Sequence, residues 1–208
     1  MEDKDFLYKD QLILEALKEF AEKGFDAASL NQIIKRAGIS KGSFYHHFHG
    51  KEELFNSVIH RAAQEKIEFI NQWLEQHHGG EKPRGFFDYL RLYMAGGIEF
   101  AIQHPELSGF LMSVMKNPQM QAKALALAPP YYDQVFSELI TEAQQKGQLR
   151  DDFDPEFTKK LLNYTLLSLG QLILDSSGDT IDQAQLKKQT DQFIDFLQRG
   201  LGAPPIDT

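Results

Sequence analysis

The stretch Ser29–Phe55, SLNQIIKRAGISKGSFYHHFHGKEELF, decides the fold of this 208-residue chain. It contains two short apolar patterns at helical spacing, separated by Gly38. Ser29, with Gln32 three residues later, has the spacing of a capping box, and Ser40 can cap the following helix. The stretch therefore predicts a helix-turn-helix whose turn is only about three residues long.

A bracing helix is expected on each side of this pair. Upstream, apolar residues at helical spacing run to Phe20 and predict a helix that ends at Gly24. A left-handed conformation at that glycine would let Phe25 fold back on Phe20. Downstream, residues 49–53 start a long fourth helix that runs to about His77. A helix pair braced in this way can lay its second helix in the major groove of DNA.

The second helix of the pair carries the side chains that would contact DNA. Ile39, Phe44 and Phe48 are expected to face inward. The residues left for the groove and its walls are Lys41, Gly42, Ser43, Tyr45, His46 and His47. Lysine can contact guanine acceptors or phosphate, the hydroxyls can contact phosphate, and histidine can contact either. Lys51, at a helix N-terminus, can pair with a phosphate beside free backbone amides.

The quoted stretch resembles the DNA-binding signature of the tetracycline-repressor (TetR) family, and the resemblance covers roughly residues 9–60. The elements of the family pattern are a capping residue, a glycine turn, a Tyr-x-x-Phe helix and a Lys-Glu pair, found here as Ser29, Ala37–Ser40, Tyr45–Phe48 and Lys51-Glu52. The resemblance implies DNA contacts for Ser29, Lys41, Gly42, Ser43, Tyr45, His46, His47 and Lys51. One departure is Asn31-Gln32, where an acidic and a small or hydrophobic residue are also common; it bears on sequence specificity rather than fold.

The net charge of −8 is unfavourable for a DNA-binding protein, but the charge is unevenly distributed. Residues 1–66 carry a balance of −1 and residues 67–208 a balance of −7. Between Gly24 and Lys51 the balance is +3. This window is where nucleic acid would bind.

The composition is that of a globular protein, with 42% hydrophobic and 25% charged residues. The absence of cysteine excludes disulfides, thiolate zinc sites and a cysteine nucleophile. The start of the chain is charged, and the longest apolar region, Leu161–Leu174, is broken by polar residues and is too short to span a membrane. We expect a cytoplasmic protein without a membrane partner.

Helical periodicity continues to the end of the chain, so we expect an all-α fold of about nine helices. The Gly- and Pro-containing segment His77–Arg84 is the clearest linker. We expect a three-helix helix-turn-helix DNA-binding domain over residues 1–50. A ligand-binding and dimerisation domain would follow over 51–208, with the helix 51–77 connecting the two.

The resemblance implies a small-molecule cavity among the middle helices. Candidate lining residues are aromatic or methionine: Phe86, Tyr89, Tyr93, Phe100, Phe110, Met112, Met115, Tyr132 and Phe136. Such residues suit an adaptable apolar pocket, and at helical spacing they equally suit a packed core. Gly96-Gly97, inside a predicted helix, indicates a kink or a close helix approach, and a pocket wall would be one reason for it.

The last two helices are rich in leucine, and apolar residues cover nearly all sides of the first of them. One face must therefore find a partner. The expected interface residues are Leu162, Leu166, Leu169, Ile173, Phe193, Ile194 and Leu197. Two such helices from each subunit would form a four-helix bundle with two-fold symmetry, as the resemblance also suggests, so the operator should be pseudopalindromic.

The sequence thus favours a ligand-responsive transcriptional regulator, a repressor that a small apolar or aromatic effector releases from double-stranded operator DNA. No cofactor, catalytic residue or metal site is expected. An enzyme would have to use His46, His47 and His49 or the pair His77-His78. His46 and His49 lack a nearby carboxylate at ligand spacing, and His77-His78 lies in a Gly-rich turn where adjacent side chains diverge. The second alternative is a protein-binding adaptor whose N-terminal region has lost DNA affinity, as the overall acidity would allow.

Overall fold

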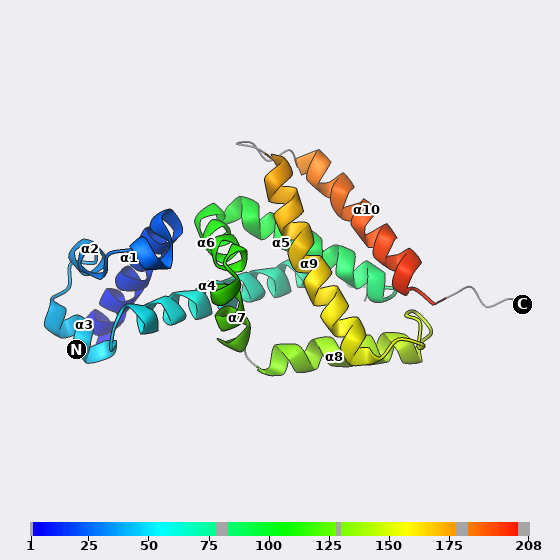
Figure 1. The fold of residues 1–208 in the computed structure, drawn as a ribbon, viewed down its shortest axis with the longest axis horizontal. Coiled ribbons are helices and arrows are strands. Elements are labelled where there is room, and N and C mark those ends of the chain that lie inside the picture. The colour runs from blue at the N-terminus through cyan, green and yellow to red at the C-terminus, as the bar shows by residue number, and fades with distance from the viewer. Residues whose placement is uncertain (1, 78–82, 128–129, 178–182, 204–208) are drawn as a thin grey trace, which may run out of the picture. The chain divides into compact units, whose positions relative to one another are not determined.

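The computed structural model describes residues 2–77, 83–127, 130–177 and 183–203. These residues form α-helices, and an isolated bridge between Leu149 and Gly202 is the one β-type pairing among them. The helices, shown in Figure 1, are α1 (Glu2–Ala27), α2 (Leu30–Arg36), α3 (Lys41–His47), α4 (Lys51–His77), α5 (Phe86–Gln103), α6 (Pro105–Lys116), α7 (Pro118–Leu127), α8 (Pro130–Gln145), α9 (Pro155–Ser177) and α10 (Gln183–Leu201). The all-α prediction is confirmed.

The described residues contain ten helices where about nine were expected. A proline is the first residue of α6, α7, α8 and α9. Proline fits the first turn of a helix, because its fixed φ is helical and its missing N–H would have no partner there. These prolines divide the second half of the chain into separate helices.

The helices form two compact units. The first contains Met1–Glu68 and Phe100–Ala128, and the second contains Phe69–Glu99 and Pro129–Thr208. Helices α4 and α5 contribute residues to both. Packing therefore divides the chain differently from the boundary expected after residue 50, because α6 packs against α1 inside the first unit. The functional division of the chain remains a prediction.

Aromatic rings hold the first unit together. The ring of Phe55 on α4 lies 4.9 Å from that of Phe20 on α1 and 5.9 Å from that of Phe110 on α6, both in edge-to-face arrangements. Phe25 stacks on Phe20 at 6.2 Å, as the sequence predicted for a chain that turns back at Gly24. Gly24 has the expected positive φ of 71°, although helical hydrogen bonding resumes after this kink and α1 extends to Ala27.

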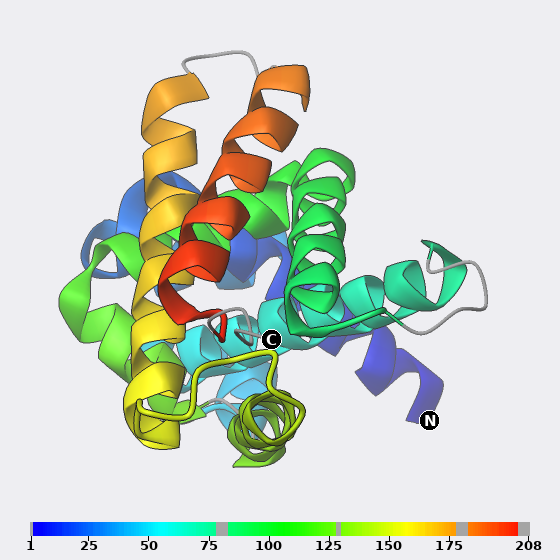
Figure 2. The same ribbon diagram turned by 90° about the vertical axis from the view of Figure 1, so that its right-hand side faces the viewer.

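The second unit is built around one hydrophobic core. Its buried residues come from α5, α8, α9, α10 and the segment between α8 and α9: Phe86, Phe87, Leu90, Ile140, Ala143, Leu149, Leu162, Ile194, Leu197 and Leu201. Helices α9 and α10 lie side by side (Figures 1 and 2). Arg91 of α5 pairs with Asp195 of α10 at 2.7 Å and with Asp191 at 3.4 Å. A hydrophobic core and a network of ion pairs therefore join α5 to α10.

Helices α4 and α5 approach closely at Gly96. A Cβ atom at this position would lie 3.2 Å from Cε3 of Trp73 and 3.4 Å from Cγ2 of Ile70. At Gly97 a Cβ atom would meet no other atom within 4 Å. The close approach that the Gly96-Gly97 pair predicted is confirmed, and the structure assigns it to Gly96.

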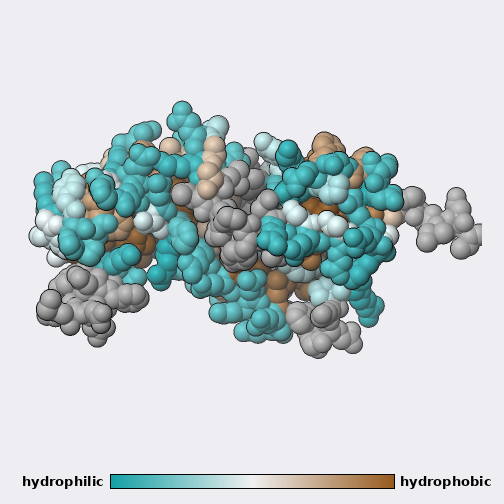
Figure 3. Space-filling model, turned by 90° about the horizontal axis from the view of Figure 1, so that it is seen from below, coloured by the Kyte–Doolittle hydropathy of each residue, from teal (hydrophilic) through white to brown (hydrophobic). Residues whose placement is uncertain are grey.

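The face displayed in Figure 3 is largely hydrophilic, with smaller hydrophobic areas between the hydrophilic ones. In the described part of the chain, no helix combines the length and the apolar character needed to cross a membrane.

Candidate nucleic-acid interface

The N-terminus of α2 is held by two side chains, one of which the sequence did not reveal. The Oγ atom of Ser29 accepts a hydrogen bond from the backbone N–H of Gln32 at 3.4 Å, as the capping-box spacing predicted. The N–H of Ser29, however, donates to Oε1 of Glu19 on α1 at 3.1 Å. In a capping box, the side chain of Gln32 would accept the hydrogen bond from the Ser29 N–H. Here Glu19 of the preceding helix accepts it instead.

Glu19 is a buried acidic hub, with 0% of its surface exposed. Its carboxylate accepts hydrogen bonds from Lys23 at 2.8 Å and from Arg36 at the end of α2 at 3.0 Å. The hydrogen bond from Lys23 first, and then that from the Ser29 N–H, hold the pKa of Glu19 below its ordinary value. The sequence could have revealed this role through the position of Glu19 on α1. Glu19 follows Ala16 by three residues and so lies on the apolar stripe of the helix, where burying an unpaired carboxylate would cost free energy.

Helix α3 is fixed from behind and exposed in front. The Oγ atom of Ser40 accepts from the N–H of Ser43 at 3.0 Å, and the turn before it contains Gly38 with a φ of 69°. Phe44 and Phe48 are buried with their rings stacked at 5.6 Å. The opposite side exposes Lys41, Gly42, Tyr45, His46 and His47, while Ser43 is partly buried. Tyr45 has 59% of its surface exposed.

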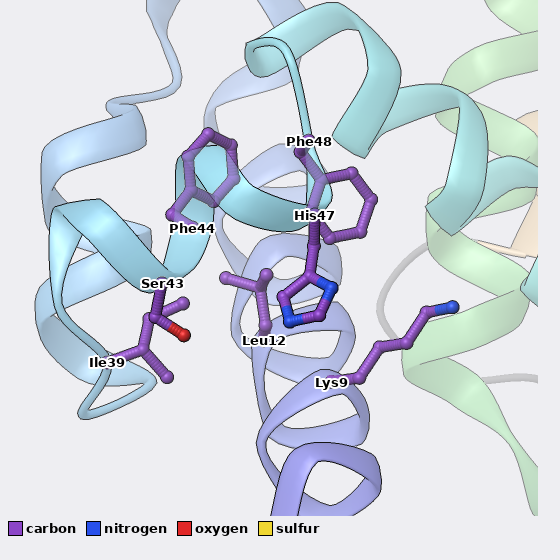
Figure 4. Close-up of a pocket in the computed structure, with 7 residues that line it drawn as sticks. All are labelled: Lys9, Leu12, Ile39, Ser43, Phe44, His47 and Phe48. Carbon is purple, nitrogen blue, oxygen red and sulfur yellow. The ribbon is translucent and has the colours of Figure 1, made fainter.

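The ring of His47 turns toward α1. Figure 4 shows it pointing toward Leu12 and Lys9 of that helix, at the edge of a small depression. The depression has a cavity volume of about 10 Å³, the space of a single water molecule. It can therefore hold water between α1 and α3 but no effector.

Lys51, the first residue of α4, is used inside the protein. Its Nζ atom donates to the carbonyl oxygens of Asp26 and Ala28, each at 3.1 Å, and lies 4.8 Å from the centre of the Phe25 ring. An ammonium group has three N–H donors. Lys51 thus secures the connection between α1 and α2, and one donor remains for a phosphate.

A second acid caps α4. Oε2 of Glu53 accepts from the backbone N–H of His49 at 2.6 Å and contacts Nδ1 of the same residue at 2.8 Å. The backbone hydrogen bond is the main cause of the lowered pKa of the Glu53 carboxyl. This cap stabilises the start of α4 at Lys51, four residues after the last residue of α3.

Residues 12–58, which form this braced helix pair, match the family model described as bacterial regulatory proteins, tetR family. The chain is also 30% identical over 152 residues to the HTH-type transcriptional regulator UidR of Escherichia coli K12, an alignment that covers 72% of this chain and 74% of UidR. The chain belongs to the TetR family of transcriptional regulators.

Two further TetR-family relatives are similar. The negative regulator IcaR of the biofilm operon icaADBC of Staphylococcus epidermidis is 32% identical over 82 residues, covering 39% of this chain and 43% of IcaR. The structure of SmeT, the repressor of the Stenotrophomonas maltophilia multidrug efflux pump SmeDEF, superimposes with a TM-score of 0.69 at 21% identity. That superposition covers 96% of this chain and 93% of SmeT. It supports the fold over nearly the whole chain.

The residues expected to line an effector cavity are divided between the two units of this TetR-family chain. Phe100, Phe110, Met112 and Met115 belong to the first, and Phe86, Tyr89, Tyr93 and Phe136 to the second. Phe86, Phe100 and Phe110 are buried, and burial raises the pKa values of Tyr89 and Tyr93. The side chain of Tyr132 lies outside the described residues. No cluster of metal-binding side chains occurs among the described residues.

The residues expected at the dimer interface lie mostly inside the subunit. Leu162, Leu169, Ile194 and Leu197 are buried in the single chain, and Leu166 and Phe193 are partly buried. The side chain of Ile173 lies outside the described residues. Within the single chain, the side chains of Leu162, Leu169, Ile194 and Leu197 are covered by other residues of the same subunit. Their role at a dimer interface remains a prediction. Among the described side chains of α9 and α10, the exposed large hydrophobic residues are Phe157, Tyr164 and Phe196.

Proposed function

We propose that this TetR-family regulator is a cytoplasmic repressor that binds a pseudopalindromic operator as a homodimer and is released by a small apolar or aromatic effector. The exposed side of α3 is the observation that carries the proposal. Lys41, Tyr45 and His46 are exposed on one side of α3, while two stacked phenylalanines hold the helix from the other side. A helix presented in this way can enter the major groove.

The side chains of α3 divide into two roles in this proposal. Lys41, Tyr45 and His46 are exposed and contact base edges or phosphates. His47 and Ser43 lie on the side of α3 that borders α1, and they contact phosphates. At Gly42 a Cβ atom would meet no protein atom closer than 3.7 Å, so the protein itself has room for a side chain there. We assign the absence of one to close approach of the DNA backbone.

The flanking residues Ser29 and Lys51 bind phosphate. The Ser29 oxygen accepts from the N–H of Gln32, which leaves the hydroxyl proton for a phosphate oxygen. The third N–H of Lys51 is available in the same way. These contacts fix the position of the protein on the duplex without reading its sequence.

Release by an effector requires a path to α1 and α3. Helix α4 belongs to both packing units, and α6 packs against α1 within the first. An effector that displaces α4 or α6 would therefore move the braced helix pair. Couplings of about 1–3 kcal/mol between two sites weaken operator binding about 5- to 150-fold.

The dimer in this proposal is formed by α9 and α10 through the exposed residues Tyr164 and Phe196, with 70% and 68% of their surfaces exposed. Aromatic side chains are enriched in the cores of protein interfaces.

Selection of bound sequences from random duplex DNA tests the function directly. We expect an enriched pseudopalindrome, bound by two copies of the chain, whose affinity falls steeply with salt. Tyr45→Phe, which removes an exposed hydroxyl, should weaken operator binding about tenfold without changing the melting temperature. The absence of any enriched sequence at low salt would overturn the proposal in favour of a protein-binding adaptor.

A further inference from the structure

The small depression between α1 and α3 in the first unit is apolar inside and polar at its rim (Figure 4). The buried side chains of Leu12, Phe44 and Phe48 form its floor, together with the partly buried Ile39. The polar side chains that line it are exposed or partly exposed: Lys9, Ser43 and His47. Polar groups from two helices therefore surround the opening of an apolar hollow.

Helical spacing on both helices brings these polar side chains together. Lys9 precedes Leu12 by three residues and so lies on the same side of α1. Ser43 and His47 are four residues apart and share one face of α3. Within the described parts of the chain, neither the ammonium group of Lys9 nor the hydroxyl group of Ser43 has a hydrogen-bond or ion-pair partner. Both donors are therefore available to a ligand.

We propose that this depression is a binding site for a phosphate of the DNA backbone, which Lys9 of α1 binds together with Ser43 and His47 of α3. The proposal rests on the operator binding proposed above and adds α1 to the surface that contacts DNA. When a helix lies in the major groove, the phosphates of the groove wall pass along its flanks. The flank of α3 with Ser43 and His47 borders α1, so a phosphate there lies within reach of the flexible Lys9 side chain.

The size and the charge of the depression suit a phosphate oxygen. Its cavity volume is about 10 Å³, which holds one phosphate oxygen as it would hold one water molecule. An ammonium group and a hydroxyl group both donate hydrogen bonds to such an oxygen, and the bond from the ammonium group is charge-assisted. The adjacent acid, Asp10, pairs with Arg61 at 3.4 Å, so its charge is balanced by a residue other than Lys9. A phosphate therefore meets donors and a positive charge at this rim.

Salt titration of operator binding by the full chain tests the proposal. Lys9→Gln should make the slope of log affinity against log salt shallower by about 1 and weaken binding about two- to fivefold, because one exposed phosphate contact is lost. Lys18→Gln makes the same charge change at another exposed lysine, nine residues along α1 and therefore on the opposite side of the helix. It should leave the slope unchanged. Lys9→Gln should keep the melting temperature of wild type, which shows that the fold is intact.

Methylphosphonate substitution in the operator identifies the phosphate that is bound. When backbone phosphates are replaced one at a time by the neutral methylphosphonate, each half-site should contain a position where wild type loses affinity and Lys9→Gln does not. Ser43→Ala should show a reduced loss at the same position, because Ser43 and Lys9 share one phosphate in this proposal. Lys18→Gln should keep the wild-type response at every position.

An unrelated duplex of the same length, titrated in parallel at low salt, keeps this proposal distinct from the proposed function. Phosphate contacts do not depend on sequence, so Lys9→Gln should make the slope shallower on both duplexes. Equal binding of the two duplexes by wild type would overturn the sequence-specific repressor, while the slopes would still decide the role of Lys9. An unchanged slope for Lys9→Gln, an equal change for Lys18→Gln, or a wild-type methylphosphonate pattern in Lys9→Gln would each overturn the phosphate site. A wild-type protein that binds neither duplex would overturn both proposals.

Discussion

The carboxylate of Glu19 on α1 accepts a hydrogen bond from the backbone N–H of Ser29 at 3.1 Å and so holds the residue that caps α2. Replacement by glutamine keeps the shape and removes the charge that Lys23 and Arg36 require. Glu19→Gln should lower the free energy of unfolding at pH 7 by about 2 kcal/mol, since hydrogen bonds to a buried charge are lost. Urea denaturation measures this change.

The pH dependence of this loss has a defined sign. Because the pKa of Glu19 is lowered in the folded protein, its stabilisation is present above the ordinary value of about 4.5 and is lost as the pH falls through the folded-state pKa. The difference between wild type and Glu19→Gln should therefore shrink in acid. Glu22→Gln, at an exposed position three residues along α1, serves as the control and should be nearly neutral. If Glu19→Gln were as stable as Glu22→Gln, the hydrogen bonds of the Glu19 carboxylate would not stabilise the fold.

Lys41 and Lys51 should both contribute to the salt dependence of operator binding but differ in their effect on stability. Each variant, Lys41→Ala or Lys51→Met, should reduce the slope of log affinity against log salt by about 1, as expected for one lost phosphate contact. Only Lys51→Met should lower the melting temperature, because Lys51 also bonds the carbonyls of Asp26 and Ala28. Fluorescence anisotropy at several salt concentrations and thermal unfolding separate the two effects. An unchanged slope for Lys51→Met would restrict this residue to a structural role.

Gly96 and Gly97 form a matched pair for the contact between α4 and α5. Gly96→Ala should destabilise the protein by about 1 kcal/mol, because the cost of overpacking against Trp73 and Ile70 exceeds the gain in helix propensity. Gly97→Ala has open space and should stabilise the helix by up to about 1 kcal/mol. Equal effects of the two substitutions on chemical denaturation would be inconsistent with a close approach at Gly96 alone.

Phe196→Glu should dissociate the proposed dimer. A carboxylate in the centre of an apolar interface has no partner and should weaken self-association by at least about tenfold. Gln192→Glu adds the same charge one turn earlier on α10, at another exposed position, and should have a much smaller effect. Sedimentation equilibrium gives both association constants. A Phe196→Glu protein that remains dimeric would show that another surface forms the interface.

Local sequence determined the helix pair because the signals lie within a few residues of one another. Ser40 and Ser43 are three residues apart, and their cap follows from the geometry of any helix start. Gly38 adopts the positive φ that favours glycine in the turn between α2 and α3. The inward faces of Phe44 and Phe48 follow from helical periodicity in the same way.

Only the tertiary structure decided which partners these elements found. Lys51 donates to the carbonyl oxygen of Asp26, 25 residues earlier in the chain, and Arg36 of α2 donates to Glu19 of α1. Neither contact follows from the spacing of the two residues in the sequence. Likewise, periodicity marks Leu162 and Ile194 as apolar without saying whether a helix of the same chain or of another covers them. The fold placed both in the core of their own subunit, because an apolar stripe is satisfied by whichever surface packs against it.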